Sequence, residues 1–286
     1  MANNIKTVVI TGGSDGIGKE AARQLKNAGH NVIIVGRSKE KTEQAAKELS
    51  VPYHIADFSD LSQVKRLAEE LKHYEKIDVL ANNAGAIFNE RTVTGDGIER
   101  TFQVNVLGEF LLTALLIEKL CKDKATVIQT SSIASNLFGQ GLDLDDLQNV
   151  RAYTPTKAYG ESKLCNILFT KELHKRYNEK GLSAVAFEPG VTRTNFASEG
   201  SAFLRIAYHS PLKYLFTIST ERSAKRLTRL ALGQPGRDFT SGAVYSYKKP
   251  YRVKLKDDGK ISYELFKKCD ELLQKSLLCD SIFIEK

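Results

Sequence analysis

Short runs of β-branched and apolar residues alternate with helical patterns along the first two-thirds of the chain. The runs are nearly continuous rather than alternating apolar with polar residues, which is typical of strands buried on both faces of a parallel sheet. The predicted strands cover residues 7–10, 32–35, 53–55, 77–80, 126–128 and 183–187, with one more at 244–245. Predicted helices include residues 17–28, 61–73, 97–120 and 262–278. The alternation predicts an α/β fold, a doubly wound parallel sheet of about seven strands with helices on both faces.

No linker, repeat or low-complexity segment interrupts this pattern. The chain has 286 residues, a length that fits one large domain, so we expect residues 1–286 to form a single domain. Its net charge is +8 and its isoelectric point about 9.1. Lys and Arg are spread along the chain beside Asp and Glu and form no basic stripe, so nucleic-acid binding is not expected. A basic surface also attracts anionic ligands.

Four cysteines, Cys121, Cys165, Cys269 and Cys279, occur without a C-x-x-C pair or a histidine at metal-ligand spacing. We therefore expect neither a metal site nor a disulfide framework, and a reducing compartment is the simplest interpretation. The N-terminus has no signal-type apolar run, and no stretch reaches the roughly 20 apolar residues of a membrane span. These observations predict a cytoplasmic protein without a transmembrane segment.

A glycine-rich segment follows the first predicted strand directly and precedes a helix. In an open α/β sheet this is where a dinucleotide binds, because glycine permits a tight turn and close approach of the backbone to a pyrophosphate. The helix N-terminus adds unpaired N–H groups and a partial positive charge. The segment therefore predicts a Rossmann-type nucleotide site. Its predicted contact residues are Gly12, Ser14, Asp15, Gly16, Ile17 and Gly18.

The second predicted strand is followed by Arg37 and Ser38, with no acidic residue beside Arg37. An Asp or Glu at this position would bind the ribose 2′-hydroxyl of NAD and repel a 2′-phosphate. A guanidinium favours the 2′-phosphate instead. The position therefore predicts NADP(H) as the cofactor, and an ordinary surface arginine is the alternative.

Tyr159 and Lys163 lie four residues apart in a segment with a buried helical stripe, so on a helix they share one face. A free tyrosine has a pKa near ~10 and is a poor acid or base at neutral pH. A nearby ammonium lowers the pKa of a phenol by roughly 1 to 3 pH units. The pair therefore indicates a general acid/base, although helix-surface pairs with this spacing are common.

Tyr153 and Lys157 have the same spacing, but Pro155 separates them. Proline fits the first helical position and not the interior, and Thr154 before it suits an N-cap. Tyr153 then precedes the helix while Lys157 lies in its first turn, so we expect this second pair to share no helical face.

In these motifs and their order, the chain resembles the short-chain dehydrogenase/reductase family. The resemblance extends from residue 7 to about residue 245, and each motif is weak alone while the ordered set is specific. The motifs are residues 11–18, Asp57, Asn82-Asn83-Ala84-Gly85, Asn105, Ser131-Ser132, Tyr159-x-x-x-Lys163 and Pro189-Gly190.

The resemblance implies roles for further residues. Ser132, rather than its neighbour Ser131, would hydrogen-bond the substrate oxygen, and Asn105 would hold a water in a proton relay with Tyr159 and Lys163. A structural role for Asn105 is the alternative, because a buried polar side chain without a partner costs ~1–3 kcal/mol. The implied cofactor contacts are Asp57, Phe58, Asn83, Ala84, Gly85, Tyr159, Lys163, Pro189, Gly190, Val191 and Thr194.

The segment 133–158 is longer than in many members of the family and carries an acidic stretch at 143–146. Together with residues 159–170 it resembles the retinol-dehydrogenase-like branch. A predicted substrate lid at about 195–220 contains several aromatic residues, which favour an apolar or bulky substrate. Core packing of those aromatics, and contact of the lid with a membrane surface, are open alternatives.

Together these features predict an NADP(H)-dependent oxidoreductase that transfers a hydride between nicotinamide and a carbonyl or alcohol. The expected partner is that small-molecule substrate, and a homo-oligomer stays open. Two alternatives use the same fold. One is a sugar-nucleotide epimerase or dehydratase, which has a differently spaced glycine loop, and the other is a non-catalytic NADP-sensing regulator.

Overall fold

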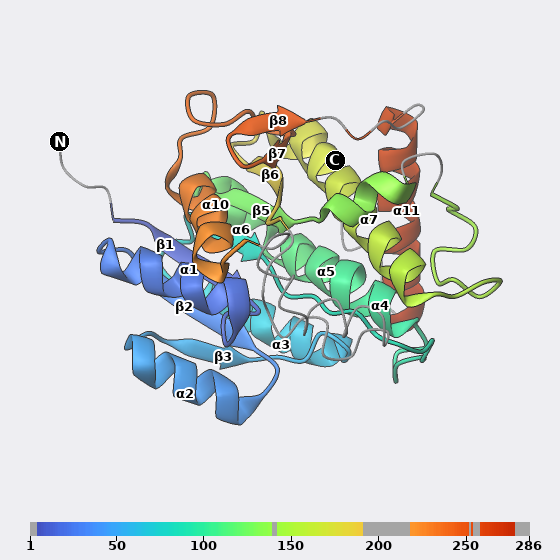
Figure 1. Ribbon diagram of the computed structural model, residues 1–286, viewed down its shortest axis with the longest axis horizontal. Coiled ribbons are helices and arrows are strands. Elements are labelled where there is room, and N and C mark those ends of the chain that lie inside the picture. The colour runs from blue at the N-terminus through green and yellow to red at the C-terminus, as the bar shows by residue number, and fades with distance from the viewer. Residues whose placement is uncertain (1–4, 139–141, 191–217, 252, 254–257, 278–286) are drawn as a thin grey trace.

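The computed structural model describes residues 5–138, 142–190, 218–251, 253 and 258–277. Strands in this part of the chain form one sheet in the order β3-β2-β1-β4-β5-β6-β7-β8 (Figure 1). All neighbours are parallel except β8, which is antiparallel to β7. The strands are β1 Thr7–Thr11, β2 Asn31–Gly36, β3 Tyr53–Ile55, β4 Val79–Asn82, β5 Thr126–Thr130, β6 Ser183–Glu188, β7 Val244–Ser246 and β8 Lys249–Tyr251.

Helices cover both faces of the sheet (Figure 1). One face carries α1 Gly16–Asn27, α2 Lys39–Leu49 and α10 Thr220–Leu232. The other carries α3 Leu61–Lys72, α5 Gly108–Leu115, α6 Ile117–Lys122 and α7 Pro155–Tyr177, with α11 Asp258–Leu277 packed against α7. Three short elements contact α7. They are α4 Arg100–Phe102, the π-helix η1 Gln103–Leu107 and the 3-10 helix η2 Ile133–Phe138.

Successive residues of one strand enter two different hydrophobic cores. Val9 of β1 contributes to the core under α3, α5 and α7. Val8 and Ile10 contribute to the core under α1, α2 and α10. Because both side-chain faces are buried, these strands lack the alternation of a half-exposed sheet. The predicted doubly wound parallel sheet is confirmed.

The eighth strand and one helix differ from the sequence prediction. β8 was not predicted; it contains Pro250, which lacks a ladder N–H, and it lies at the sheet edge, where proline is tolerated. The helical stretch predicted over 97–120 is present, but it begins at Arg100 and is not one regular α-helix. It consists of α4, η1, α5 and α6: the Glu99 carboxylate caps its start, and the backbone widens into a π-turn at η1.

The acidic stretch at 143–146 anchors the long segment before α7. The Asp146 carboxylate accepts the N–H groups of Val150 and Arg151 at 2.7 and 3.2 Å. Asp145 binds Lys268 of α11 at 2.9 Å. The stretch therefore fastens this insertion to the C-terminal helix.

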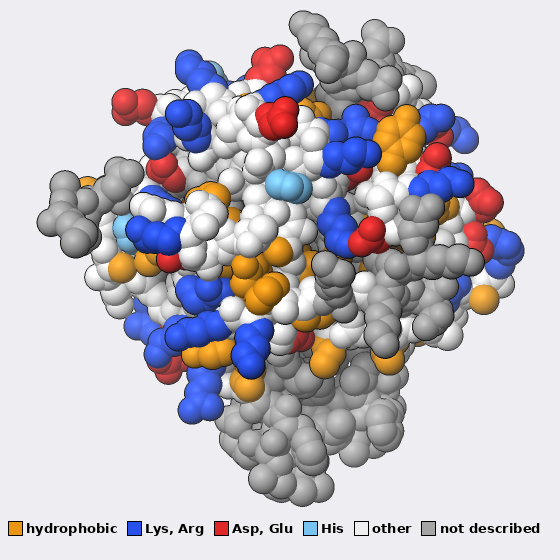
Figure 2. Space-filling model, turned by 90° about the horizontal axis from the view of Figure 1, so that it is seen from above, with side chains coloured by type: hydrophobic (Ala, Val, Ile, Leu, Met, Phe, Trp, Pro, Cys, Tyr) orange, Lys and Arg blue, Asp and Glu red, His pale blue; other side chains and the backbone are white. Residues whose placement is uncertain are grey.

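The predicted lid at about 195–220 lies almost wholly outside the described residues, since 191–217 are not described. That residues 1–286 form a single domain stays a prediction. Within the described ranges no helix has the length and apolarity needed to cross a bilayer. Lys and Arg side chains on the face shown in Figure 2 are spread out with Asp and Glu between them.

A core substitution tests the packing of α11 on the rest of the fold. Phe110 is 1% exposed, and its ring lies 4.9 Å from the ring centroids of both Phe169 and Phe266. We expect Phe110→Ala to lower the free energy of unfolding by about 3–5 kcal/mol in urea denaturation. Val93→Ala, at a residue that is 54% exposed, is the control and should change it by less than about 0.5 kcal/mol. Equal effects would contradict this packing.

Candidate active site

A threonine hydroxyl joins the carboxyl ends of β1 and β4. Thr11 Oγ1 accepts the backbone N–H groups of Asn83 and Ala84, each at 2.9 Å, and Asn83 Nδ2 donates to Thr11 O at 3.0 Å. Gly12 follows with φ +65°, and a Cβ added there would lie 3.0 Å from Ala84 Cα. The glycine loop and the Asn83–Ala84 segment are therefore in direct contact.

The first turn of α1 forms a cradle lined by backbone. A Cβ added to Gly18 would lie 2.2 Å from Gly12 O, so only glycine fits. Asp15 is the N-cap and accepts the Gly16 N–H at 2.7 Å, so α1 begins one residue earlier than predicted. Backbone N–H groups at such a helix start suit a pyrophosphate. The residues present therefore fit a dinucleotide.

The end of β2 lies beside this loop. A Cβ added to Gly36 would lie 2.9 Å from Ser14 Oγ. Arg37 follows and is exposed. Ser38 caps α2, because its Oγ accepts the Lys41 N–H at 3.4 Å. Arg37 is thus exposed at the end of the strand that contacts the glycine loop.

Asp57 and Phe58 follow β3 and lie in different environments. Asp57 Oδ1 accepts both the N–H and the hydroxyl of Ser59, at 2.9 and 2.7 Å, which orients the carboxylate. The Phe58 ring is buried against Gly108 of α5. The Phe58 side chain therefore belongs to the core. The predicted cofactor contact of Phe58 would have to be made by its backbone atoms.

Helix α7 begins as the sequence predicts. Thr154 Oγ1 accepts the Lys157 N–H at 3.1 Å, and Pro155 is the first helical residue. Tyr159 and Lys163 both lie inside the helix, and Lys163 Nζ is 5.8 Å from the centroid of the Tyr159 ring. Tyr153 precedes the helix, and its hydroxyl donates to Phe88 O at 2.9 Å. The prediction that Tyr153 and Lys157 share no helical face is confirmed.

Lys163 is buried at the end of β5. Its side chain is 2% exposed, and Nζ donates to Thr130 O at 3.0 Å. Burial lowers the pKa of Lys163, and the charge of Glu109 opposes that effect. A Cβ added to Gly85 would lie 3.1 Å from Lys163 Nζ and 3.3 Å from Asn105 Oδ1. Lys163, Gly85 and Asn105 therefore meet at one point.

Asn105 is held by hydrogen bonds to the protein. Its Oδ1 accepts the Ala86 N–H and its Nδ2 donates to Ala86 O, each at 2.9 Å. Nδ2 also donates to Ser162 Oγ of α7 at 3.1 Å. These bonds satisfy the polar group inside η1 and give it a structural role, while its contact with a relay water stays a prediction.

The two serines after β5 are distinguished by burial. Ser131 is buried, and its hydroxyl donates to Lys163 O at 2.8 Å. Ser132 is partly exposed, and its Oγ accepts the Ala134 N–H at 3.2 Å. Ser132 is therefore the one of the pair that a substrate can reach.

The segment after β6 borders α10. Pro189 O accepts the Ser223 hydroxyl at 2.9 Å, and Arg226 Nη1 donates to Glu188 O at 3.0 Å. Gly190 has φ +80°. Val191 and Thr194, the other predicted contacts here, lie outside the described residues.

The sequence prediction missed two buried residues beneath Lys163. Glu109 of α5 and Asn166 of α7 are each 1% exposed. Asn166 Nδ2 donates to Glu109 Oε2 and to Thr130 O, each at 3.4 Å. The sequence signal that could have identified Glu109 is a carboxylate within the apolar run 106–116.

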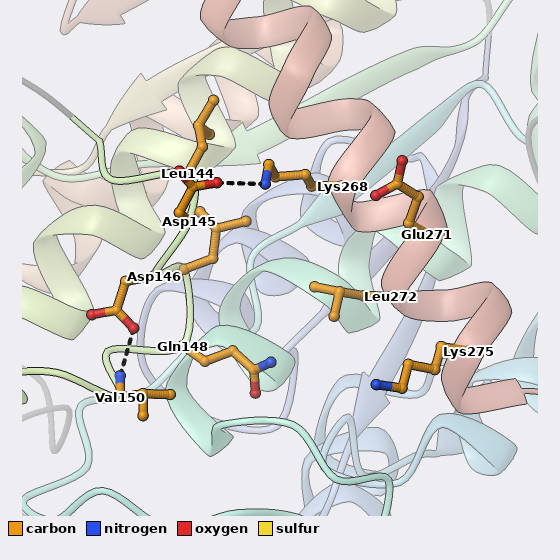
Figure 3. A pocket seen from close by; sticks show the side chains of 10 residues that line it. Leu144, Asp145, Asp146, Gln148, Val150, Lys268, Glu271, Leu272 and Lys275 are labelled. Atoms are coloured by element: carbon orange, nitrogen blue, oxygen red, sulfur yellow. Dashed lines mark hydrogen bonds and ion pairs between the residues drawn. The ribbon is translucent and has the colours of Figure 1, made fainter.

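A groove between residues 144–150 and α11 lies apart from this site (Figure 3). None of the predicted site residues lines it.

This arrangement has known counterparts. The short chain dehydrogenase family model matches residues 6–144. Retinol dehydrogenase 13 of Homo sapiens is 37% identical over 243 residues, covering 80% of this chain and 72% of that protein. A protein provisionally named daunorubicin C-13 ketoreductase DnrU, of Streptomyces sp. (strain C5), is 37% identical over 250 residues, covering 84% and 83%. A crystal structure of an uncharacterized protein from Mycobacterium paratuberculosis matches with TM-score 0.72 and 30% identity, covering 94% and 93%.

Substituting one glycine of the cradle tests whether the loop holds a dinucleotide. In Gly18→Ala the new Cβ would meet Gly12 O at 2.2 Å, so the loop must shift. We expect the Kd for the reduced dinucleotide, measured by fluorescence titration, to rise by about tenfold or more, equivalent to about 1.4 kcal/mol. Gly95→Ala, where nothing lies within 4 Å of the new Cβ, is the control. Unchanged binding in folded Gly18→Ala would refute this cradle.

Proposed function

The chain belongs to the short-chain dehydrogenase/reductase family, and we propose that it is an NADP(H)-dependent member acting on an apolar or bulky carbonyl or alcohol. The proposal starts from the nicotinamide-dependent oxidoreduction that members of this family catalyse. The observation that carries the proposal is the placement of Tyr159 beside Lys163, whose ammonium is buried and bonded to Thr130 O next to Gly85.

The proposed chemistry in the reductive direction uses three side chains. When bound, the nicotinamide cofactor supplies the hydride. Ser132 donates a hydrogen bond that orients the substrate carbonyl oxygen, and Tyr159 donates a proton to that oxygen. The Lys163 ammonium stabilises the tyrosinate that remains. In the oxidative direction the same tyrosinate accepts the alcohol proton.

The cofactor is proposed to lie along the carboxyl edge of the sheet. The glycine loop and the start of α1 would hold the pyrophosphate, and Asn83 and Gly85 would border the ribose. Asp57 would contact the adenine, and Pro189 and Gly190 would border the nicotinamide. Arg37 would bind the 2′-phosphate of NADP(H), which its exposed position at the end of β2 supports.

Two features support the remaining parts of the proposal. The relatives named for retinol and for the C-13 ketone of daunorubicin support a bulky organic substrate. Cys121, Cys165 and Cys269 are free thiols, which supports a reducing compartment such as the cytoplasm. We propose that one domain carries both cofactor and substrate sites.

Replacing the proposed acid/base tests the function directly. We expect Tyr159→Phe to reduce kcat for NADPH oxidation with a panel of aldehydes, ketones and quinones by about 10²–10⁴-fold, with the Kd for NADPH changed little. Tyr153→Phe, which removes a structural hydroxyl, is the control and should keep its turnover. Near-wild-type turnover in Tyr159→Phe would refute the assignment, and NADPH binding without turnover of any substrate would favour an NADP sensor.

Replacing Arg37 tests the cofactor preference. A hydrogen bond to a charged group contributes about 1.5–3 kcal/mol, so Arg37→Ala should raise the Kd for NADPH by about 10- to 150-fold and leave that for NADH nearly unchanged. Lys39→Ala removes the same charge two residues away, from a side chain that is 79% exposed, and should have little effect. Tighter binding of NADH than of NADPH by the unmodified protein would contradict the proposed preference.

A further inference from the structure

Glu109 has a buried carboxyl group that takes no part in the proposed reaction. It lies on α5 and is 1% exposed. Its Oε2 accepts one long hydrogen bond, 3.4 Å from Asn166 Nδ2, and its Oε1 has no hydrogen-bond partner among the described residues. Burying such a group costs free energy unless a partner compensates it. Burial raises the pKa of Glu109 to about 8, while the charge of Lys163 opposes that effect.

One carbonyl and one amide connect Glu109 to Lys163. Thr130 O accepts both Lys163 Nζ, at 3.0 Å, and Asn166 Nδ2, at 3.4 Å. The same Asn166 nitrogen donates to Glu109. The carboxyl therefore lies one amide group away from the acceptor that positions the Lys163 ammonium.

The other described groups around Glu109 are neutral. Thr113 of α5 donates to the Glu109 backbone carbonyl and accepts from Asn82 of β4. Gln129 of β5 is paired with Asn82 in the sheet register. Helix α3, which packs against α5, buries only apolar side chains. Among the described groups, Lys163 is the one whose charge acts on Glu109.

We propose that Glu109 is a positioning residue that keeps Lys163 charged at alkaline pH and so sets the upper pH limit of the Tyr159 acid/base. The inference rests on the proposed function, because it assigns Glu109 a role through Lys163 rather than on the substrate.

The physical basis is that the ionisation of Glu109 and the protonation of Lys163 influence each other electrostatically. A buried lysine alone loses its proton more easily than an exposed one, because the low dielectric disfavours the ammonium. As the pH rises, the Glu109 carboxyl ionises and its negative charge stabilises the ammonium of Lys163. Lys163 thereby keeps the charge that Tyr159 needs over a wider pH range.

The test is the pH profile of Glu109→Gln, which keeps the shape of the neutral carboxyl and removes its charge. We expect kcat/KM within about twofold of the unmodified enzyme at pH 6.5 and about tenfold lower at pH 9, because without the Glu109 charge Lys163 would lose its proton at a lower pH. Glu161→Gln is the control, because Glu161 lies on α7 and interacts with Asn149 and Lys157. Its activity ratio should not vary with pH.

A second readout needs no cofactor. Folding raises the pKa of Glu109, so the folded protein binds this proton more tightly than the unfolded chain does. The contribution of Glu109 to the free energy of unfolding is therefore largest below about pH 4.5 and is lost as the pH rises toward 8. The melting temperature of Glu109→Gln, relative to the unmodified protein, should therefore increase from pH 5 to pH 8. It also shows directly whether the variant folds.

Three outcomes would overturn the inference: a Glu109→Gln activity ratio that is constant with pH, the same alkaline loss in Glu161→Gln, or the same loss in Glu109→Asp, which retains an ionisable carboxyl. Each would leave the proposed function intact if Tyr159→Phe is inactive. An active Tyr159→Phe would instead refute the proposed function itself.

Discussion

The parallel pairing of β1 with β4 is the constraint on which the site depends. From β1 the chain builds outward through β2 and β3, and from β4 it builds the other way through β5 to β7. The crossover connections therefore diverge at this point, and in open α/β sheets ligands bind at such a point beside the carboxyl ends of the strands. The Thr11 hydroxyl, bonded to Asn83 and Ala84, holds the two strand ends together. The glycine loop and Gly85 take their positions from this junction, and Lys163 approaches Gly85 from α7 while bonded to Thr130 of β5.

Burying the ionisable side chains of Lys163 and Glu109 costs folding free energy. Lys163 and Glu109 are both buried, and replacing buried charged pairs by well-packed apolar side chains is often neutral or stabilising. The carbonyl of Thr130 and the amide of Asn166 compensate only part of that cost, since Glu109 Oε1 has no described partner. A carboxyl held this way is expected at a functional site rather than in a structural core.

Sequence reasoning succeeded where one local signal was sufficient. Apolar runs located the seven parallel strands, and Thr154 with Pro155 located the start of α7 and separated Tyr159 from Tyr153. It failed where the deciding contact came from elsewhere in the chain. The helical stretch predicted over 97–120 contains the π-turn η1, in which the Asn105 side chain bonds Ala86, and β8 forms where it pairs with β7 at the sheet edge.

The sequence by itself determined the fold class and the shared helical face of Tyr159 and Lys163, because hydrophobic period, capping and spacing are local properties of the chain, and its ordered motifs carried the resemblance to the family. Only the tertiary structure decided which polar groups are buried together. It placed Lys163 against Thr130 and Gly85, separated accessible Ser132 from buried Ser131, and brought Glu109 beneath Lys163 through Asn166. These contacts join residues from different strands and helices, so their energies depend on packing that no single segment encodes.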